Sequence, residues 1–403
     1  MPIPISHRLL CFRTCILRVF VLFCCFSSPS VQADQLDDDL QTVWEALWDQ
    51  RGTPRQILRW DISKTVTYSI SGPAAAQNKD HLLKALEAVS QASGVRFIDI
   101  LVPQNVPTQI MLDIEVVKDS DIEPTMPCFV RNLRWRNFML EKVAMKMGAR
   151  HAWQCSFHEM MHAMGIAGHP SGKTVLSYFP YRRDVLMDLD KLMLATIYAS
   201  DMPSGATPLE ALQILAKQVA AQPQLRLAPT IAQERASAFI EQTKLAMTQF
   251  AQGQGDIPSI IRRSGRASES HIANARAEMA YFLGLTAARD TLALRNLGEA
   301  YKWFALAANA GHARAQLYLG RAYKYGIGVD ILIDKAQAIA WLTKAASSGI
   351  PEAKLELTNL MEAKNSLVLP AATPTPPTAT PQPQPNLPNH DIAHPSHPVP
   401  SKL

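Results

Sequence analysis

A short run near the middle of the chain combines residue types and a spacing that suit a metal centre. His158 and His162 are four positions apart, which places both imidazoles on one face of a helix as two ligands of a single zinc ion. Glu159 lies beside them, where a carboxylate can take a proton from a metal-activated water and deliver it to a leaving amine. The pattern predicts hydrolytic chemistry with Glu159 as the general base.

The residues after His162 predict how a third ligand reaches the same metal. Gly165 falls one turn later, where a helix that ends in a left-handed residue needs glycine, and Gly168 adds a second permissive position. The chain can then turn back so that His169 completes a three-histidine set and leaves a fourth position open for water and substrate. His151 comes seven residues before His158, which places it about 10 Å from His158 along the helix and excludes it from that metal.

The run from His158 to His169 resembles the metzincin metallopeptidases, whose pattern is His-Glu-x-x-His-x-x-Gly-x-x-His followed by a methionine-containing turn. The match holds through Gly165, and the third histidine comes one residue later than in the family. The resemblance implies zinc as the cofactor and a peptide or protein as the substrate. It also implies a twisted sheet above the active-site helix, with an edge strand that pairs with an extended peptide.

Residues 174–179 resemble the family's turn, with Leu176 at the methionine position. The resemblance implies that Leu176 forms an apolar floor and that Tyr178 stabilises the transition state or acts as a switchable ligand. Met187 is a competing candidate for the methionine, although Leu189 then stands where the tyrosine is expected.

The sequence before this run predicts a strand, a helix and two more strands. Residues 65–70 alternate as a strand does, and apolar residues recur at helical spacing from 82 to 89. Further strands are expected over 95–100 and 108–117, after a segment from 34 to about 61 that is helical and acidic at first. This order indicates an α/β or α+β domain.

The elements around the active-site helix complete that domain. We expect a helix over 138–147 that breaks at Gly148, and the active-site helix from Ala149 or Arg150 to Met164. A loop through Pro180 and a helix from about 184 to 198 follow, ending at Pro203-Ser204-Gly205. The predicted α+β zincin/metzincin-like catalytic domain therefore spans 58–205, preceded by an N-terminal segment at 34–57.

The C-terminal half contains an internal repeat. Residues 299–311 align with residues 337–349 at a period of 38, each with a tryptophan, paired alanines and a final glycine. Residues 315–349 resemble Sel1-like repeats, relatives of the tetratricopeptide type. We expect an all-α repeat domain over 271–362, joined by a helical linker at 206–270. The array predicts a concave face for a protein partner, and a structural cap is the alternative.

The N-terminus predicts export. Arginines and an apolar stretch precede Ser30-Val31-Gln32-Ala33, as in a signal peptide spanning 1–33. The apolar stretch is short for a membrane span, so no stable span is expected after cleavage, and an uncleaved anchor is the alternative. We expect a periplasmic or secreted protein.

The cysteines agree with that compartment. Four of the six cysteines lie within 1–33, which leaves Cys128 and Cys155 in the mature chain. An even pair in an exported protein suggests a disulfide, and two reduced core cysteines are the alternative.

Composition excludes some partners. The 403 residues are 47% hydrophobic and 19% charged with a net charge of +5, and the basic residues are scattered, so nucleic acid is not an expected partner. The short run Arg262, Arg263 and Arg266 is interpreted as a solvated linker. Residues 363–403 are rich in proline and threonine and are expected to be disordered.

Two functions of different classes follow. The first is an exported zinc-dependent metalloendopeptidase whose repeats dock a protein. The second is a catalytically degenerate zincin-fold adaptor that acts through its Sel1-like repeats; the shifted His169 and Leu176 favour it, and the intact His158, Glu159 and His162 favour the first.

Overall fold

The computed structural model describes residues 29–102, 110–177, 184–265, 267–289, 297–326 and 331–366. The chain divides into two compact units, residues 1–357 and 358–403. Residues 1–28 of the predicted signal peptide, Tyr178, and residues 367–403 of the tail that was predicted to be disordered lie outside the described residues.

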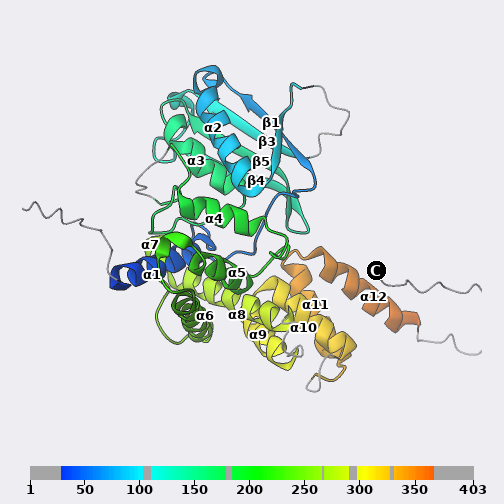
Figure 1. Ribbon diagram of the computed structural model, residues 1–403. Coiled ribbons are helices and arrows are strands. Elements are labelled where there is room, and N and C mark those ends of the chain that lie inside the picture. The colour runs from blue at the N-terminus through cyan, green and yellow to red at the C-terminus, as the bar shows by residue number, and fades with distance from the viewer. Residues whose placement is uncertain are drawn as a thin grey trace, which may run out of the picture. The chain divides into compact units, whose positions relative to one another are not determined.

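One mixed sheet organises the N-terminal α/β region (Figure 1). Its strands are β1 (Thr65–Ser71), β2 (Arg96–Asp99), β3 (Met111–Val117), β4 (Cys128–Arg136) and β5 (Met139–Gly148), in the order β2-β1-β3-β5-β4. Strands β2, β1, β3 and β5 are parallel, and β4 pairs antiparallel with β5. Strand β4 therefore forms one edge of the sheet, and β2 forms the other.

Helices cover one face of this sheet, and the other face is polar. Helices α2 (Ala75–Ser93) and α3 (Ala152–Ala163) lie side by side over the sheet, and α4 (Asp188–Ile197) packs against α2 (Figure 1). Along β3, Leu112, Ile114 and Val116 are fully buried. The intervening acidic residues of β3 make ion pairs with lysines of β5, Asp113 with Lys142 and Glu115 with Lys146. This alternation is what a sheet with one covered face requires.

The expected helix over 138–147 is wrong, because this segment is strand β5 of a hairpin. Its methionines, alanines and lysines are good helix formers, but its buried side chains Val143, Met145 and Met147 alternate as in a strand. The turn residues Asn137 and Phe138 have φ of 49° and 63°, the left-handed conformations that a two-residue hairpin turn needs. Pairing on both sides overrides the local preference.

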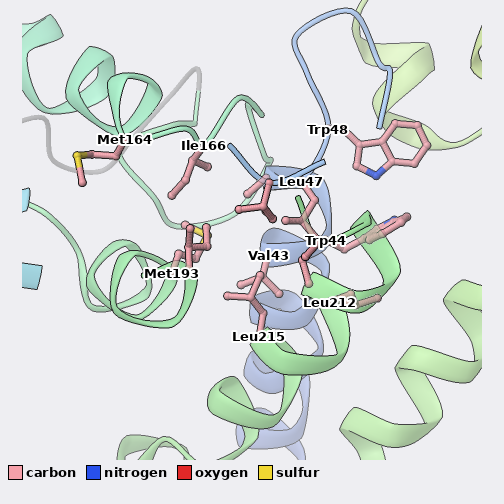
Figure 2. Close-up of a cluster of buried hydrophobic side chains, with 14 of the residues drawn as sticks. Val43, Trp44, Leu47, Trp48, Met164, Ile166, Met193, Leu212 and Leu215 are labelled. Carbon is pink, nitrogen blue, oxygen red and sulfur yellow. The ribbon is translucent and has the colours of Figure 1, made fainter. Parts of the chain in front are cut away.

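Helix α1 (Pro29–Ala46) ends fifteen residues earlier than Asp61, the position to which the helical segment was expected to run. A turn follows in which Gly52 has a φ of 73°. Figure 2 shows Val43 and Trp44 of α1 and the following Leu47 in one apolar cluster with Leu212 and Leu215 of α5 and with Met164, Ile166 and Met193 from the other side. The core is therefore continuous from the end of helix α3 to α1 and α5.

The rest of the unit is helical. It contains α5 (Pro208–Ala220), α6 (Pro229–Ala251), α7 (Ser259–Arg263), α8 (Glu269–Arg289), α9 (Leu297–Asn309), α10 (Ala313–Tyr325), α11 (Lys335–Ser347) and α12 (Pro351–Ser366), whose last turns belong to the second unit. Helix α8 packs on α9, and α10 packs on α11. At Gly320 an added Cβ would lie 2.8 Å from Leu342 Cγ, so glycine allows α10 to approach α11 this closely.

Among the described residues, no helix is long and apolar enough to cross a membrane. The arginine run at 262–266 was interpreted as a solvated linker, and this interpretation is wrong for Arg263. That residue ends helix α7 and forms an ion pair with the buried carboxylate of Glu45 at 2.6 Å.

Candidate metal centre

Helix α3 presents His158 and His162 with fixed ring orientations. Their Nδ1 atoms lie 2.8 Å from the carbonyl oxygen of Val175 and 2.7 Å from that of Ile166. A carbonyl only accepts, so each Nδ1 carries the proton, and each Nε2 keeps its lone pair. Both imidazoles are thus oriented with Nε2 ready to bind a metal, as hydrogen bonds from the non-ligating nitrogen do in metal sites.

His169 completes a triangle of ring nitrogens. Its Nε2 lies 2.9 Å from Nε2 of His158 and 3.2 Å from Nε2 of His162, and the latter two are 3.1 Å apart. Nitrogen ligands about 2.05 Å from a tetrahedral ion are about 3.3 Å from one another, so a small expansion of the triangle accommodates such an ion. These three residues could hold a metal ion.

The surroundings of His162 and His169 favour their uncharged form. Burial, followed by the neighbouring His158, lowers the pKa of His169 to about 3. Burial also lowers the pKa of His162 well below its usual value, with His158 and His169 contributing. Neutral imidazoles are the form that binds metals, so the cluster is prepared to accept a cation rather than a proton.

The turn after α3 is formed as the sequence predicted. Gly165 has a φ of 95°, and an added Cβ there would lie 1.8 Å from the carbonyl oxygen of Leu58. Trp60 Nε1 donates to the carbonyl of Ala163, and Tyr198 Oη donates to that of Met164, both at 2.9 Å. These bonds satisfy carbonyls at the helix end, where intrahelical partners are missing.

Glu159 is 4% exposed, and burial raises the pKa of its carboxyl to about 8. A cation held by the adjacent histidines would favour the ionised carboxylate. Glu159 lines a cleft of about 320 Å³ together with His158 and His169. The cleft is also lined by residues just before β4 and by its first residue, among them Thr125 and Cys128. Glu159 and two of the three histidines thus face one accessible space.

A disulfide lies at the rim of this cleft. Cys128, the first residue of β4, is bonded to Cys155, which lies one turn before His158 on α3. The predicted pairing is confirmed, and it fixes the edge strand β4 to helix α3. Both sulfurs and the Glu159 carboxylate lie within 4.8 Å of one another. A disulfide has no thiolate to offer, so this second group of potential ligands is not a metal site.

The segment that was compared with the methionine-containing turn runs beside His158. Leu176 is fully buried, as an apolar floor requires, whereas Tyr178 lies outside the described residues. Met187 precedes helix α4 as its N-cap residue, and its backbone N–H donates to Asp190 at 2.9 Å. Asp190 also accepts from Val175 N–H at 3.1 Å and from the hydroxyl of Thr174.

Sequence reasoning missed the residues that support the histidines. Val175 and Ile166 act through backbone carbonyls, which no side-chain pattern signals. Asp190 and Glu45 are buried carboxylates, 0% and 2% exposed, on helices far from the motif in sequence. His151, as expected, is not among the clustered ligands.

Comparison with known proteins identifies part of the helical region. Residues 273–312 and 313–350 each match the Sel1 repeat family. The chain contains two Sel1 repeats. The predicted repeats are thereby confirmed over 273–350, within helices α8 to α11, and stacked helical repeats of this kind suggest protein–protein interaction. Neither a curated protein nor a solved structure matches the chain.

Proposed function

We propose that this chain is an exported zinc-dependent metalloendopeptidase of the metzincin kind. The observation that carries the proposal is the convergence of the Nε2 atoms of His158, His162 and His169 within 3.2 Å of one another, beside the buried Glu159 in an open cleft. Three neutral nitrogen ligands with an acid–base carboxylate alongside are the set that hydrolytic zinc sites use.

The donor set favours zinc over harder cations. Imidazole nitrogens suit zinc, whereas calcium and magnesium take oxygen ligands. A bound zinc ion would supply Lewis acidity, lowering the pKa of a water and polarising a carbonyl oxygen. The three histidines would hold the ion, and the carbonyls of Val175 and Ile166 keep two of these rings in the ligating tautomer.

Glu159 performs the proton transfers in this proposal. Its carboxylate accepts a proton from the attacking water and returns it to the nitrogen of the leaving amine, so the residue ends each cycle as it began. Its burial supports this role, because a carboxyl whose pKa is raised toward neutrality both accepts and releases a proton readily.

Further support comes from the sheet. The metzincin resemblance implied a sheet above the active-site helix and an edge strand for an extended peptide. Strand β4 is such an edge, and the chain before it lines the cleft from Thr125 to Cys128. We propose that substrate backbone pairs along this edge, which places a peptide bond next to Glu159.

Export is part of the same proposal. The Cys128–Cys155 bridge is the kind of bond that persists in oxidising compartments such as the periplasm or the extracellular space. It agrees with the interpretation of residues 1–33 as a signal peptide.

A catalytically inactive adaptor is the second candidate. The Sel1 repeats favour it, since they suggest protein binding without any chemistry. Leu176 in place of methionine and the shifted His169 favour it as well. An adaptor would hydrolyse no peptide bonds. A peptidase would hydrolyse them, and its activity would require both the metal and Glu159.

Hydrolysis of an unstructured protein such as casein separates the two candidates. The zinc-loaded wild type is expected to cleave it, and Glu159→Gln is expected to retain zinc and lose activity by at least about 100-fold. His151→Ala is the matched control, because this histidine is outside the ligand cluster and should leave cleavage unchanged. Equal cleavage by wild type and Glu159→Gln, or none by either, would contradict the peptidase proposal.

A further inference from the structure

Glu45, on the last turn of helix α1, is a buried carboxylate surrounded by donors. Its Oε2 accepts from the backbone N–H and the hydroxyl of Ser171 at 2.8 and 2.9 Å and pairs with Arg263 at 2.6 Å. Its Oε1 accepts from Gln41 at 2.9 Å and Ser259 at 3.4 Å. Burying a charged carboxylate that is 2% exposed is costly unless hydrogen bonds and an ion pair compensate for the lost solvation, and these partners provide both.

Two of these bonds hold the loop that carries the third histidine. Ser171 is two residues after His169, and on the other side Gly168 N–H donates to the carbonyl of Ala46 at 3.2 Å. A Cβ at Gly168 would lie 2.4 Å from the Glu45 carbonyl oxygen, and one at Gly172 would lie 1.8 Å from Thr42 Oγ1. The loop therefore lies directly on α1, fixed on both sides of His169.

The same carboxylate connects this loop to helix α7. Arg263 and Ser259 are the last and first residues of α7, and both contact Glu45. The intervening Ile261 is fully buried, and its Cα would lie 2.8 Å from a Cβ added at Gly52. Arg263 also lines a small hollow together with His169. Helix α7 is thus packed against the turn after α1 and reaches the rim of the metal centre.

We propose that Glu45 is a positioning residue for His169, which it holds in place through Ser171 while Arg263 holds Glu45 from helix α7. This inference rests on the proposed metal site and extends it. The affinity of the three-histidine site then depends on helices α1 and α7, both outside the segment 58–205 in which the catalytic residues lie.

The test is the zinc affinity of the full chain, measured by competition with a chromophoric chelator. Glu45→Gln is expected to raise the zinc Kd about tenfold or more, the size of effect that residues supporting metal ligands produce. Ser171→Ala removes one of the two loop bonds from an exposed position and is expected to raise the Kd about threefold. Ser171 lies at the surface, so this variant is expected to fold normally. It therefore tests the proposal even if Glu45→Gln folds poorly.

Arg235→Gln is the matched control. Arg235 pairs with Asp37 and joins the same helix α1 to α6, and in the described part of the chain no hydrogen bond or ion pair joins either residue to the loop of His169. The zinc Kd of this variant is expected to stay within about twofold of the wild type, as for an exposed ion pair. An equal loss of affinity in Arg235→Gln would mean that α1 acts by general stability, and it would overturn the positioning role.

The visible absorption of bound Co²⁺ gives a readout that stability alone does not change, because it reports the number and geometry of the ligands. Glu45→Gln is expected to lower this absorption as His169 is replaced by water. Wild-type zinc affinity and an unchanged Co²⁺ spectrum in both Glu45→Gln and Ser171→Ala would overturn this inference alone. A wild type that binds no zinc would overturn the proposed function and this inference with it.

Discussion

His158 Nδ1 donates to the carbonyl oxygen of Val175 at 2.8 Å, so a metal ligand on helix α3 is oriented by the backbone of a later turn. The N–H of the same Val175 donates to Asp190 at 3.1 Å, and Asp190 is fully buried on helix α4. The orientation of His158 therefore depends on a carboxylate that does not touch it. This relationship gives the first prediction.

Asp190→Asn should destabilise the protein and weaken metal binding. The amide has one oxygen in place of two and directs its NH₂ group at donors, so about 2 kcal/mol of the free energy of unfolding should be lost. The zinc Kd should rise about tenfold as Val175 loosens. Urea unfolding and zinc titration measure the two effects.

Asp188→Asn is the control for this prediction. Asp188 lies on the same helix, is 81% exposed, and pairs with the exposed Lys191 at 3.4 Å. A change within about 0.5 kcal/mol is expected for such a residue. Similar losses for both variants would argue against a special role of Asp190.

Gly165→Ala should be far more harmful than Gly94→Ala. Both glycines follow a helix with positive φ, 95° and 76°, so alanine introduces backbone strain of about 1 kcal/mol at each. Only at Gly165 would the new Cβ meet the carbonyl of Leu58, at 1.8 Å; at Gly94 nothing lies within 4 Å. We expect Gly165→Ala to lose about 3 kcal/mol or more and to bind zinc poorly. Equal effects in thermal unfolding would refute this explanation.

Removing the disulfide should destabilise the region around the cleft. Cys128 and Cys155 are separated by 27 residues, and a cross-link closing a loop of that size stabilises a protein by about 3 to 4 kcal/mol. The Cys128→Ser/Cys155→Ser double variant should therefore unfold at lower urea concentration than the oxidised wild type. The reduced wild type should match the double variant; if all three unfold together, the bridge contributes nothing.

Asp39 predicts a pH dependence of stability. Burial, opposed by a hydrogen bond from Gln35, raises the pKa of its carboxyl to about 6. Because the pKa of Asp39 is higher in the folded than in the unfolded chain, protonating Asp39 stabilises the fold. This stabilisation is fully present below about pH 3.8 and is lost as the pH rises through 6. Asp39→Asn should stabilise the protein at pH 7 by about 1 kcal/mol, after allowance for solvent screening, and should have no effect near pH 3.5. Urea unfolding at both pH values tests this; an equal effect at both would contradict it.

Local sequence patterns correctly predicted that His158, His162 and His169 come together. The helical spacing of His158 and His162 and the turn at Gly165 involve neighbours only, so they can be inferred without the fold. The repeats were accessible for a similar reason, since a period of 38 residues is visible in the sequence itself.

Long-range contacts explain what was missed. The sequence predicts a helix over 138–147 because Met145, Lys146 and Met147 favour helices locally, and only pairing with β3 and β4 makes the segment strand β5. Glu45 is 126 residues from Ser171, and no local pattern links the two. Local motifs therefore could not predict the residues that hold the ligands in place.

Metal content per chain tests the central claim most directly. Elemental analysis of the purified mature chain should find about one tightly held zinc ion, as expected for a single three-histidine site. His162→Ala and His169→Ala should each lose it, whereas His151→Ala, the matched histidine outside the cluster, should retain it. A wild type without zinc, or zinc retained unchanged in His169→Ala, would contradict the proposed metal centre.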